Sequence, residues 1–155
     1  MSYDLMVFRK EAAPKTRADY LKWYEEQTEW TEEHNYDDPA ITSPELRNWY
    51  MEMIQTFPDM NGPFASEDED NPYDSDYSIG KDVIYVAFAW SLAELAYNKM
   101  LELAEKHGVG FFDVSSDNGN ILIPENGKLI PFDNLTNNAK DSTVGQENKP
   151  WWKFW

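Results

Sequence analysis

The sequence contains no cysteine, only two histidines, and far fewer basic than acidic residues. The absence of cysteine excludes disulfides, thiolate nucleophiles and cysteine-ligated metal sites. Thirteen lysines and arginines face 29 aspartates and glutamates, which gives a formal charge of -16. Such a charge repels nucleic-acid phosphates and anionic lipid headgroups, and it attracts basic proteins and cations. We therefore expect no direct nucleic-acid binding; the alternative role of the charge is solubility alone.

Long apolar runs are missing as well. No stretch approaches the roughly 18 apolar residues of a membrane-spanning helix. The opening residues, MSYDLMVFRK, do not place a basic region before an apolar one, as a secretory signal does. These two absences predict a cytoplasmic protein. Apolar residues nevertheless make up 41% of the 155 residues, so the chain can bury the core of one domain.

The spacing of the apolar residues predicts a mixed fold in the order β-α-α-β-α-β-β. Apolar runs predict strands, and apolar stripes that recur every three or four residues predict helices. Asn118–Gly119 and Asn126–Gly127 predict tight turns near the C-terminal end of the domain, and the second turn would add a short strand. The predicted fold class is α+β: a mainly antiparallel sheet of about four strands with three helices packed on one face, a two-layer sandwich.

Residues with strong positional preferences mark the predicted helix ends. Thr16 and Ser43 are expected N-caps, and Pro44 suits the first helical position. Ser91 and Glu94 are spaced as a capping box for the third helix. Gly108 suits the left-handed residue that follows a helix, and we expect His107, in the last turn, to have a structural role.

The predicted domain covers residues 1–135 and contains a long acidic loop at about 59–82. Residues 136–155 form a polar tail that ends in the aromatic pentapeptide WWKFW. This pentapeptide can fold back onto the domain, dock on a partner or a second copy of the chain, or touch a membrane interface. We favour folding back, keep self-association as an alternative, and expect no stable membrane insertion because the segment is short and the body acidic.

Aromatic residues exceed what a core of this size needs, and several stand within acidic stretches. Tyrosine and tryptophan are favoured at protein interfaces, where one end is buried and the other meets water. An acidic surface with aromatic anchors suits a module that captures a basic protein. The predicted binding residues are Trp30, Glu32, Glu33, Tyr36, Asp37, Asp38, Glu67, Asp68, Glu69, Asp70, Trp151, Trp152 and Trp155.

Carboxylates also raise the question of metal-assisted catalysis. The stretch EEHNYDD and the later SEDEDNPYDSD offer oxygen ligands, but neither has the spacing and central glycine of an EF-hand. We expect no catalytic residue, metal or cofactor. The alternative is a small metal-assisted hydrolase that uses Glu33, His34, Asp37 and Asp113. For Asp113 itself, bonding to the turn after its strand is the more common role.

Three blocks of the sequence, YDLMVF, VIYVAFAW and LAEKHGVGFFDVSSDNGNILIP, resemble a group of small uncharacterised bacterial cytoplasmic proteins, some of which look like toxin-associated immunity proteins. The resemblance covers roughly residues 3 to 124 and carries no catalytic motif. It implies a non-enzymatic, immunity-type inhibitor that occludes a basic bacterial toxin. A third interpretation is a nucleic-acid mimic, in which carboxylates imitate a row of phosphates.

Overall fold

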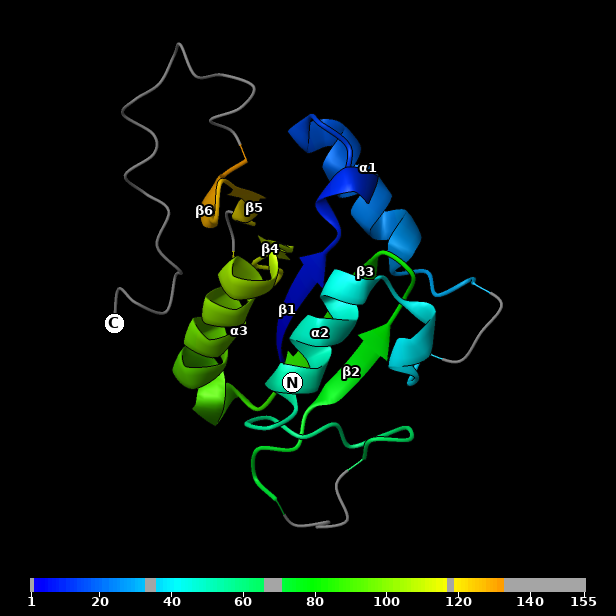
Figure 1. The fold of residues 1–155 in the computed structure, drawn as a ribbon, viewed down its shortest axis with the longest axis vertical. Coiled ribbons are helices and arrows are strands. Elements are labelled where there is room, and N and C mark those ends of the chain that lie inside the picture. The colour runs from blue at the N-terminus through cyan, green and yellow to red at the C-terminus, as the bar shows by residue number, and fades with distance from the viewer. Residues whose placement is uncertain (1, 33–35, 66–70, 117–118, 133–155) are drawn as a thin grey trace.

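The computed structural model describes residues 2–32, 36–65, 71–116 and 119–132. Their six strands form one sheet in the order β2-β3-β1-β4-β5-β6, with every neighbouring pair antiparallel (Figure 1). The elements are β1 (Tyr3–Phe8), η1 (Lys10–Ala12), α1 (Arg17–Gln27), η2 (Pro39–Ile41), α2 (Pro44–Met53), β2 (Asp76–Ile79), β3 (Val83–Phe88), η3 (Trp90–Leu92), α3 (Ala93–His107), β4 (Gly110–Phe112), β5 (Ile121–Glu125) and β6 (Lys128–Pro131).

The α+β class, the antiparallel sheet and the three α-helices are confirmed, whereas the expected four strands are too few. The first additional strand, β2, lies inside the interval assigned to the acidic loop. With four residues, this strand is too short to be recognised from the sequence within an acidic segment. Its alternate residues Tyr77 and Ile79 nevertheless point into the core and are buried. The other, β6, follows the turn at Asn126 and Gly127, both of which have positive φ angles.

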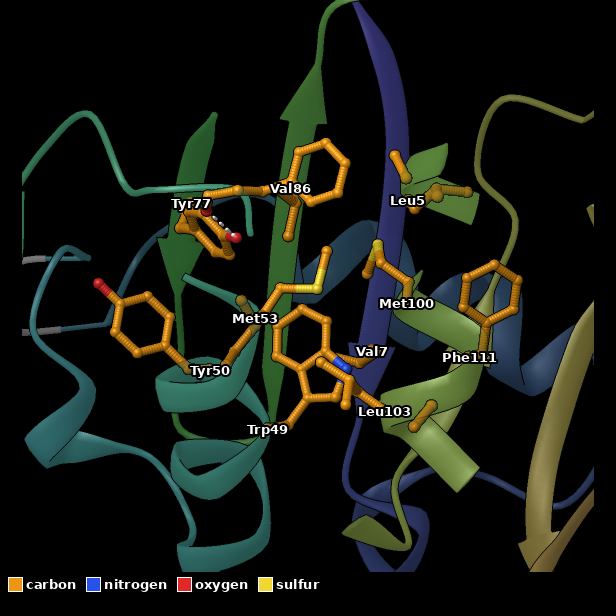
Figure 2. Packing of buried hydrophobic residues seen from close by; sticks show 14 of the residues in the cluster. Leu5, Val7, Trp49, Tyr50, Met53, Tyr77, Val86, Met100, Leu103 and Phe111 are labelled. Atoms are coloured by element: carbon orange, nitrogen blue, oxygen red, sulfur yellow. Dashed lines mark hydrogen bonds between the residues drawn. The ribbon is translucent and has the colours of Figure 1, made fainter. Parts of the chain in front are cut away.

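The helices cover both faces of the sheet, so the predicted two-layer sandwich is wrong. Alternate residues of β1 belong to two separate cores. Leu5 and Val7 pack with α2 and α3 (Figure 2), and Met6 and Phe8 pack with Tyr20 of α1. The physical reason is that a strand with apolar residues at consecutive positions must be covered on both sides. In Figure 1, α2 and α3 lie side by side and α1 lies apart from them.

Strands β3 and β4 flank β1 and are parallel to each other, because each is antiparallel to β1. Helix α3 connects them and ends at Gly108, whose φ of 69° is left-handed as predicted. The expected capping box at its start is wrong, since α3 begins at Ala93 and its N-cap, Leu92, makes no side-chain bond. The caps at Thr16 and Ser43 are confirmed.

Both outer edges of the sheet are covered within the chain. At the β2 edge, the Ile79 N–H donates to the carbonyl of Tyr36 at 2.8 Å, and the Ser75 N–H donates to that of Pro58 at 2.8 Å. At the β6 edge, the Leu129 N–H donates to the Glu105 carboxylate at 3.2 Å, and Pro131 has no N–H. These features oppose the addition of a strand from another chain.

Candidate protein-binding site

One group of acidic residues in the described structure surrounds the buried Asp59. This residue follows α2 and Pro58 and pairs with Ser75 in an isolated parallel bridge that leads toward β2. Its side chain has no exposed surface. The carboxylate accepts hydrogen bonds from the Tyr50 hydroxyl at 2.6 Å and from the Asn61 N–H at 2.9 Å. The loop after α2 is thus fastened to α2 through a buried charged group.

Aromatic contacts fix the same loop to the sheet. The Tyr77 hydroxyl of β2 donates to the Phe57 carbonyl at 2.6 Å in a buried position, and Figure 2 shows Tyr77 beside α2. The Tyr50 ring meets Tyr77 edge-on at 5.2 Å and Phe64 at 6.2 Å. Contacts of this kind stabilise beyond the area that they bury. The loop is therefore held at several points before any partner binds.

Three further aspartates from other parts of the chain act on the Tyr50–Asp59 pair. Asp37 lies so close to Gly62 that a Cβ at the glycine would stand 2.3 Å from the Asp37 carbonyl oxygen. Asp76 of β2 accepts a hydrogen bond from the Asn61 side chain at 3.1 Å. The charge of Asp38 acts on Tyr50. We call Asp37, Asp38, Asp59 and Asp76 the Asp59 cluster.

The pKa values around Asp59 reflect burial and like charges. Burial raises the pKa of Asp59 to about 6, and the charges of Asp76 and Asp37 add to the rise. The hydrogen bonds from Tyr50 and Asn61 lower it in part. The pKa of Tyr50 is raised strongly, first by burial and then by its bond to the Asp59 carboxylate. Burial is therefore the main cause of the raised pKa of Asp59, and the neighbouring aspartates contribute less.

No lysine or arginine among the described residues forms an ion pair with any member of the Asp59 cluster. The recorded ion pairs lie elsewhere, between Arg9 and Asp82, Lys10 and Glu125, Lys99 and Glu102, and from Glu52 to Lys106 and His107. Two apolar side chains of the same loop, Met60 and Phe64, are 48% and 44% exposed. Met60 and Phe64 thus expose apolar surface on the loop that begins at the buried Asp59.

The predicted aromatic anchors Trp30 and Tyr36 are half-buried and take part in the fold. Their rings meet edge-on at 5.0 Å, and Trp30 also contacts Tyr85 at 6.1 Å. The Glu32 N–H donates to the Tyr36 hydroxyl at 2.6 Å, and the Glu32 carboxylate accepts from the Lys81 N–H at 3.2 Å. These contacts attach the segment after α1 to the β2–β3 turn.

The other predicted binding residues divide into two groups. Asp37 and Asp38 belong to the Asp59 cluster, and Asp38 also caps η2 by accepting from the Ala40 N–H at 2.9 Å. The remainder lie outside the described residues: Glu33, Glu67, Asp68, Glu69, Asp70, Trp151, Trp152 and Trp155. Sequence reasoning missed Asp59, Asp76 and Tyr50. In the sequence, Asp59 is an acidic residue that follows a proline in a loop, and nothing in that pattern indicates burial. Its burial is evident only from its contacts in the structure.

A second buried carboxyl, Asp113, lies at the end of β4. The expected interaction between its side chain and the following turn is present as an electrostatic effect, since the Ser116 N–H lowers the pKa of the carboxyl. Its backbone carbonyl accepts the Ser116 N–H at 3.3 Å, and neither side-chain oxygen has a hydrogen-bond partner. Burial raises the pKa of Asp113 to about 7, and the Ser116 N–H opposes this rise.

The hydrolase interpretation requires Asp37 and Asp113 to converge. Asp37 lies near Gly62, beyond the β2 edge, whereas Asp113 follows β4, three strands away from β2. At about 4.8 Å per strand, that separation is roughly 14 Å. Glu33 and His34 lie outside the described residues. Among the residues that the structure describes, no group of three or more histidines or acids could hold a metal ion.

His107 has the structural role that its position predicted. Its Nε2 lies 2.9 Å from the carboxylate of Glu52 on α2, and Lys106 reaches the same carboxylate at 3.0 Å. These hydrogen bonds, with Lys106 first, lower the pKa of Glu52. The end of α3 is thereby joined to α2, away from the Asp59 cluster.

Comparisons of the chain with protein-family models, with curated proteins and with solved structures found no match. Within the described ranges, no helix combines the length and apolar character needed to cross a membrane.

Proposed function

We propose that this chain is a non-enzymatic protein-binding module that captures a basic protein through the Asp59 cluster and the exposed loop beside it. The observation that carries the proposal is that Asp37 and Asp76 act electrostatically on the buried Asp59, and Asp38 on Tyr50, with no lysine or arginine paired to these four aspartates among the described residues. A basic partner would supply the missing positive charge.

Electrostatics favour such a partner in two ways. The charges of Asp76 and Asp37 act unfavourably on the Asp59 carboxylate, so lysines or arginines of a partner placed near them would offset this repulsion. The overall charge of -16 would also steer a basic protein toward the surface and speed association. Both effects weaken with added salt, because exposed charges are screened.

Met60 and Phe64 would supply the apolar part of the contact. Exposed charges contribute to association rate and orientation, whereas desolvated apolar and aromatic side chains usually contribute most of the affinity. Both residues lie on the loop that Tyr50 and Tyr77 fasten to the domain. A fastened loop loses little conformational entropy on binding. Because both sheet edges are covered, we expect recognition through side chains rather than through an added strand.

The biological form that we propose is immunity-type inhibition, in which the bound module occludes a basic bacterial toxin. The resemblance of the chain to toxin-associated immunity proteins motivates this form. The aspartates of the Asp59 cluster are related through one buried hydrogen bond, and no row of carboxylates supports nucleic-acid mimicry among the described residues. The hydrolase alternative gains no supporting observation from the separation of Asp37 and Asp113.

The test is affinity capture from the source cells at low salt with three versions of the full chain. The first is the wild type, and the second carries D37N, D38N and D76N, which remove three charges and keep side chains able to hydrogen-bond. The third is a matched control with the same charge change, E25Q, E26Q and E29Q, at exposed positions in and just after α1. We expect a basic protein on the wild type and the control, and its loss from the second version.

Co-expression tests the inhibitory form. A captured protein that is toxic when expressed alone should be neutralised by the wild type and not by the Asp59-cluster variant. Absence of any basic protein on the wild type would overturn the proposed function. Capture without neutralisation would overturn inhibition and leave protein binding in place.

A further inference from the structure

Asp113 is a buried acid whose backbone is anchored and whose side chain has no partner. Its N–H donates to the Asn120 carbonyl at 2.9 Å, and its carbonyl accepts the Ser116 N–H. The side chain has no exposed surface, and neither oxygen accepts a hydrogen bond. Most buried polar groups in proteins are paired, so an unpaired carboxyl requires an explanation.

Asn120 lies opposite Asp113 at the start of the returning strand. It continues the register in which Phe112 pairs with Ile121. Residues that are directly paired across two antiparallel strands direct their side chains to the same face. Asn120 is also buried, and its Nδ2 has no acceptor. Two unpaired polar side chains therefore share one side of the β4–β5 connection.

The described side chains near Asp113 include aromatic ones on α3 and β4, and beside Asn120 the Arg17 guanidinium of α1 donates to the Gly119 carbonyl at 3.1 Å. Phe111 of β4 meets Tyr97 of α3 edge-on at 5.3 Å. The charge of Asp113 contributes to a raised Tyr97 pKa, after burial. On the β1 side, the register places apolar Leu5 opposite Asp113. Tyr97 is the titratable side chain of α3 coupled to Asp113, and the Ser116 N–H is the polar group that opposes the rise in its pKa.

A carboxyl in this setting costs little to bury when neutral and much more when ionised. The proton-bound form is therefore compatible with close packing of α3 over β4 and β5. The ionised form gains solvation whenever that packing opens. The free energy of opening should then depend on pH over the range between the pKa of the exposed and the buried carboxyl.

We propose that Asp113 and Asn120 form a proton-operated switch: the neutral Asp113 side chain keeps α3 packed on β4 and β5, and its ionisation loosens that packing near neutral pH. This inference is independent of the proposed function, because it concerns a different end of the sheet from the Asp59 cluster. It assigns to this pair a regulatory role, in which a change of pH alters the stability of one half of the domain.

The test uses the full chain labelled with ¹³C at the aspartate carboxyls, studied by NMR from pH 4 to pH 8. We expect the Asp113 carboxyl to titrate near pH 7, rather than near the ordinary value of about 4. The protection of its amide against hydrogen exchange, corrected for the intrinsic rate, should fall by up to about tenfold per pH unit between pH 5 and pH 7.

The variant D113N mimics the neutral acid and should keep high amide protection without this pH dependence. The variant D59N is the control, since it removes the other strongly shifted carboxyl and should leave the titration of Asp113 unchanged. An Asp113 midpoint near pH 4 would overturn the switch, as would an unchanged pH dependence of protection in D113N. If D113N does not fold, the carboxyl titration and the amide hydrogen exchange of the wild type are sufficient to test the proposed switch.

Discussion

The Tyr50 hydroxyl donates a 2.6 Å hydrogen bond to the Asp59 carboxylate, and both side chains are buried. This bond joins α2 to the loop that carries Met60 and Phe64 and leads toward β2. Asp37 and Asp76 add their charges around it. A structural bond and a crowded acidic surface therefore depend on the same two residues.

Replacing Tyr50 with phenylalanine should destabilise the domain. The change leaves one Asp59 oxygen buried without its donor, which costs about 1 to 3 kcal/mol. Because the Tyr50 bond lowers the pKa of Asp59, its loss should also move that pKa above about 6. Urea denaturation at pH 7 measures the first effect, and carboxyl NMR measures the second.

Tyr20→Phe is the matched control for that variant. The Tyr20 hydroxyl is also buried but has no hydrogen-bond partner. Removing it should leave the free energy of unfolding unchanged or increase it, since an unpaired polar group is lost. Equal destabilisation by both substitutions would show that the Tyr50–Asp59 bond has no special contribution.

The stability of D113N relative to the wild type should increase as the pH rises. The folded protein holds the pKa of Asp113 at about 7, above the ordinary 3.8, so it binds that proton more tightly than the unfolded chain does. The resulting stabilisation is complete below pH 3.8 and is lost as the pH rises toward 7. At pH 8 the ionised wild type should therefore be less stable than D113N, by on the order of 1 to 4 kcal/mol.

Urea denaturation of both proteins at pH 4.5 and at pH 8 measures this difference in the free energy of unfolding. Because the two proteins share all other titratable groups, the contributions of those groups cancel when the two free energies are subtracted. A gap between the two proteins that is equal at both pH values would contradict the raised pKa of Asp113.

The amino-acid sequence was a good guide to individual elements and a weaker guide to their assembly. Ser43 and Pro44 mark the start of α2 because capping depends on a few neighbouring residues. The apolar residues of β1 stand at consecutive positions, a pattern typical of a strand buried on both faces. Placing every helix on one face contradicted that pattern, and α1 packs on the second face.

The candidate site was predictable in composition and not in geometry. Asp37 and Asp38 stood out because they belong to an acidic stretch. Their approach to Asp59 depends on the loop after α2 and on β2, a strand too short to recognise within its acidic surroundings. The half-buried state of Trp30 and Tyr36 likewise arises from tertiary contacts. The spacing of residues along the chain does not indicate such long-range contacts.

Gly110→Ala should be among the more damaging small substitutions in the sheet. The ring of Phe8 lies over this glycine, and a Cβ there would stand 2.2 Å from the nearest ring atom. Either the ring or the strand would have to move, at a cost of about 1 to 3 kcal/mol.

Gly108→Ala provides the comparison, because a Cβ at that position meets nothing within 4 Å. Its cost should come only from the left-handed backbone, about 1 kcal/mol. Thermal denaturation of both variants measures the difference. A smaller loss of stability for Gly110→Ala than for Gly108→Ala would contradict the contact with Phe8.

The central claim, that the Asp59 cluster binds a basic protein, is tested most directly by the dissociation constant for the captured partner. It should be measured at low and at 0.5 M salt for the wild type, for D37N/D38N/D76N and for E25Q/E26Q/E29Q. We predict at least a tenfold weaker Kd for the cluster variant at low salt, about 1.4 kcal/mol, and less than a threefold change for the α1 control. The gap should narrow at high salt. Equal weakening by the two variants would contradict the claim, since the net charge, and not this site, would then account for binding.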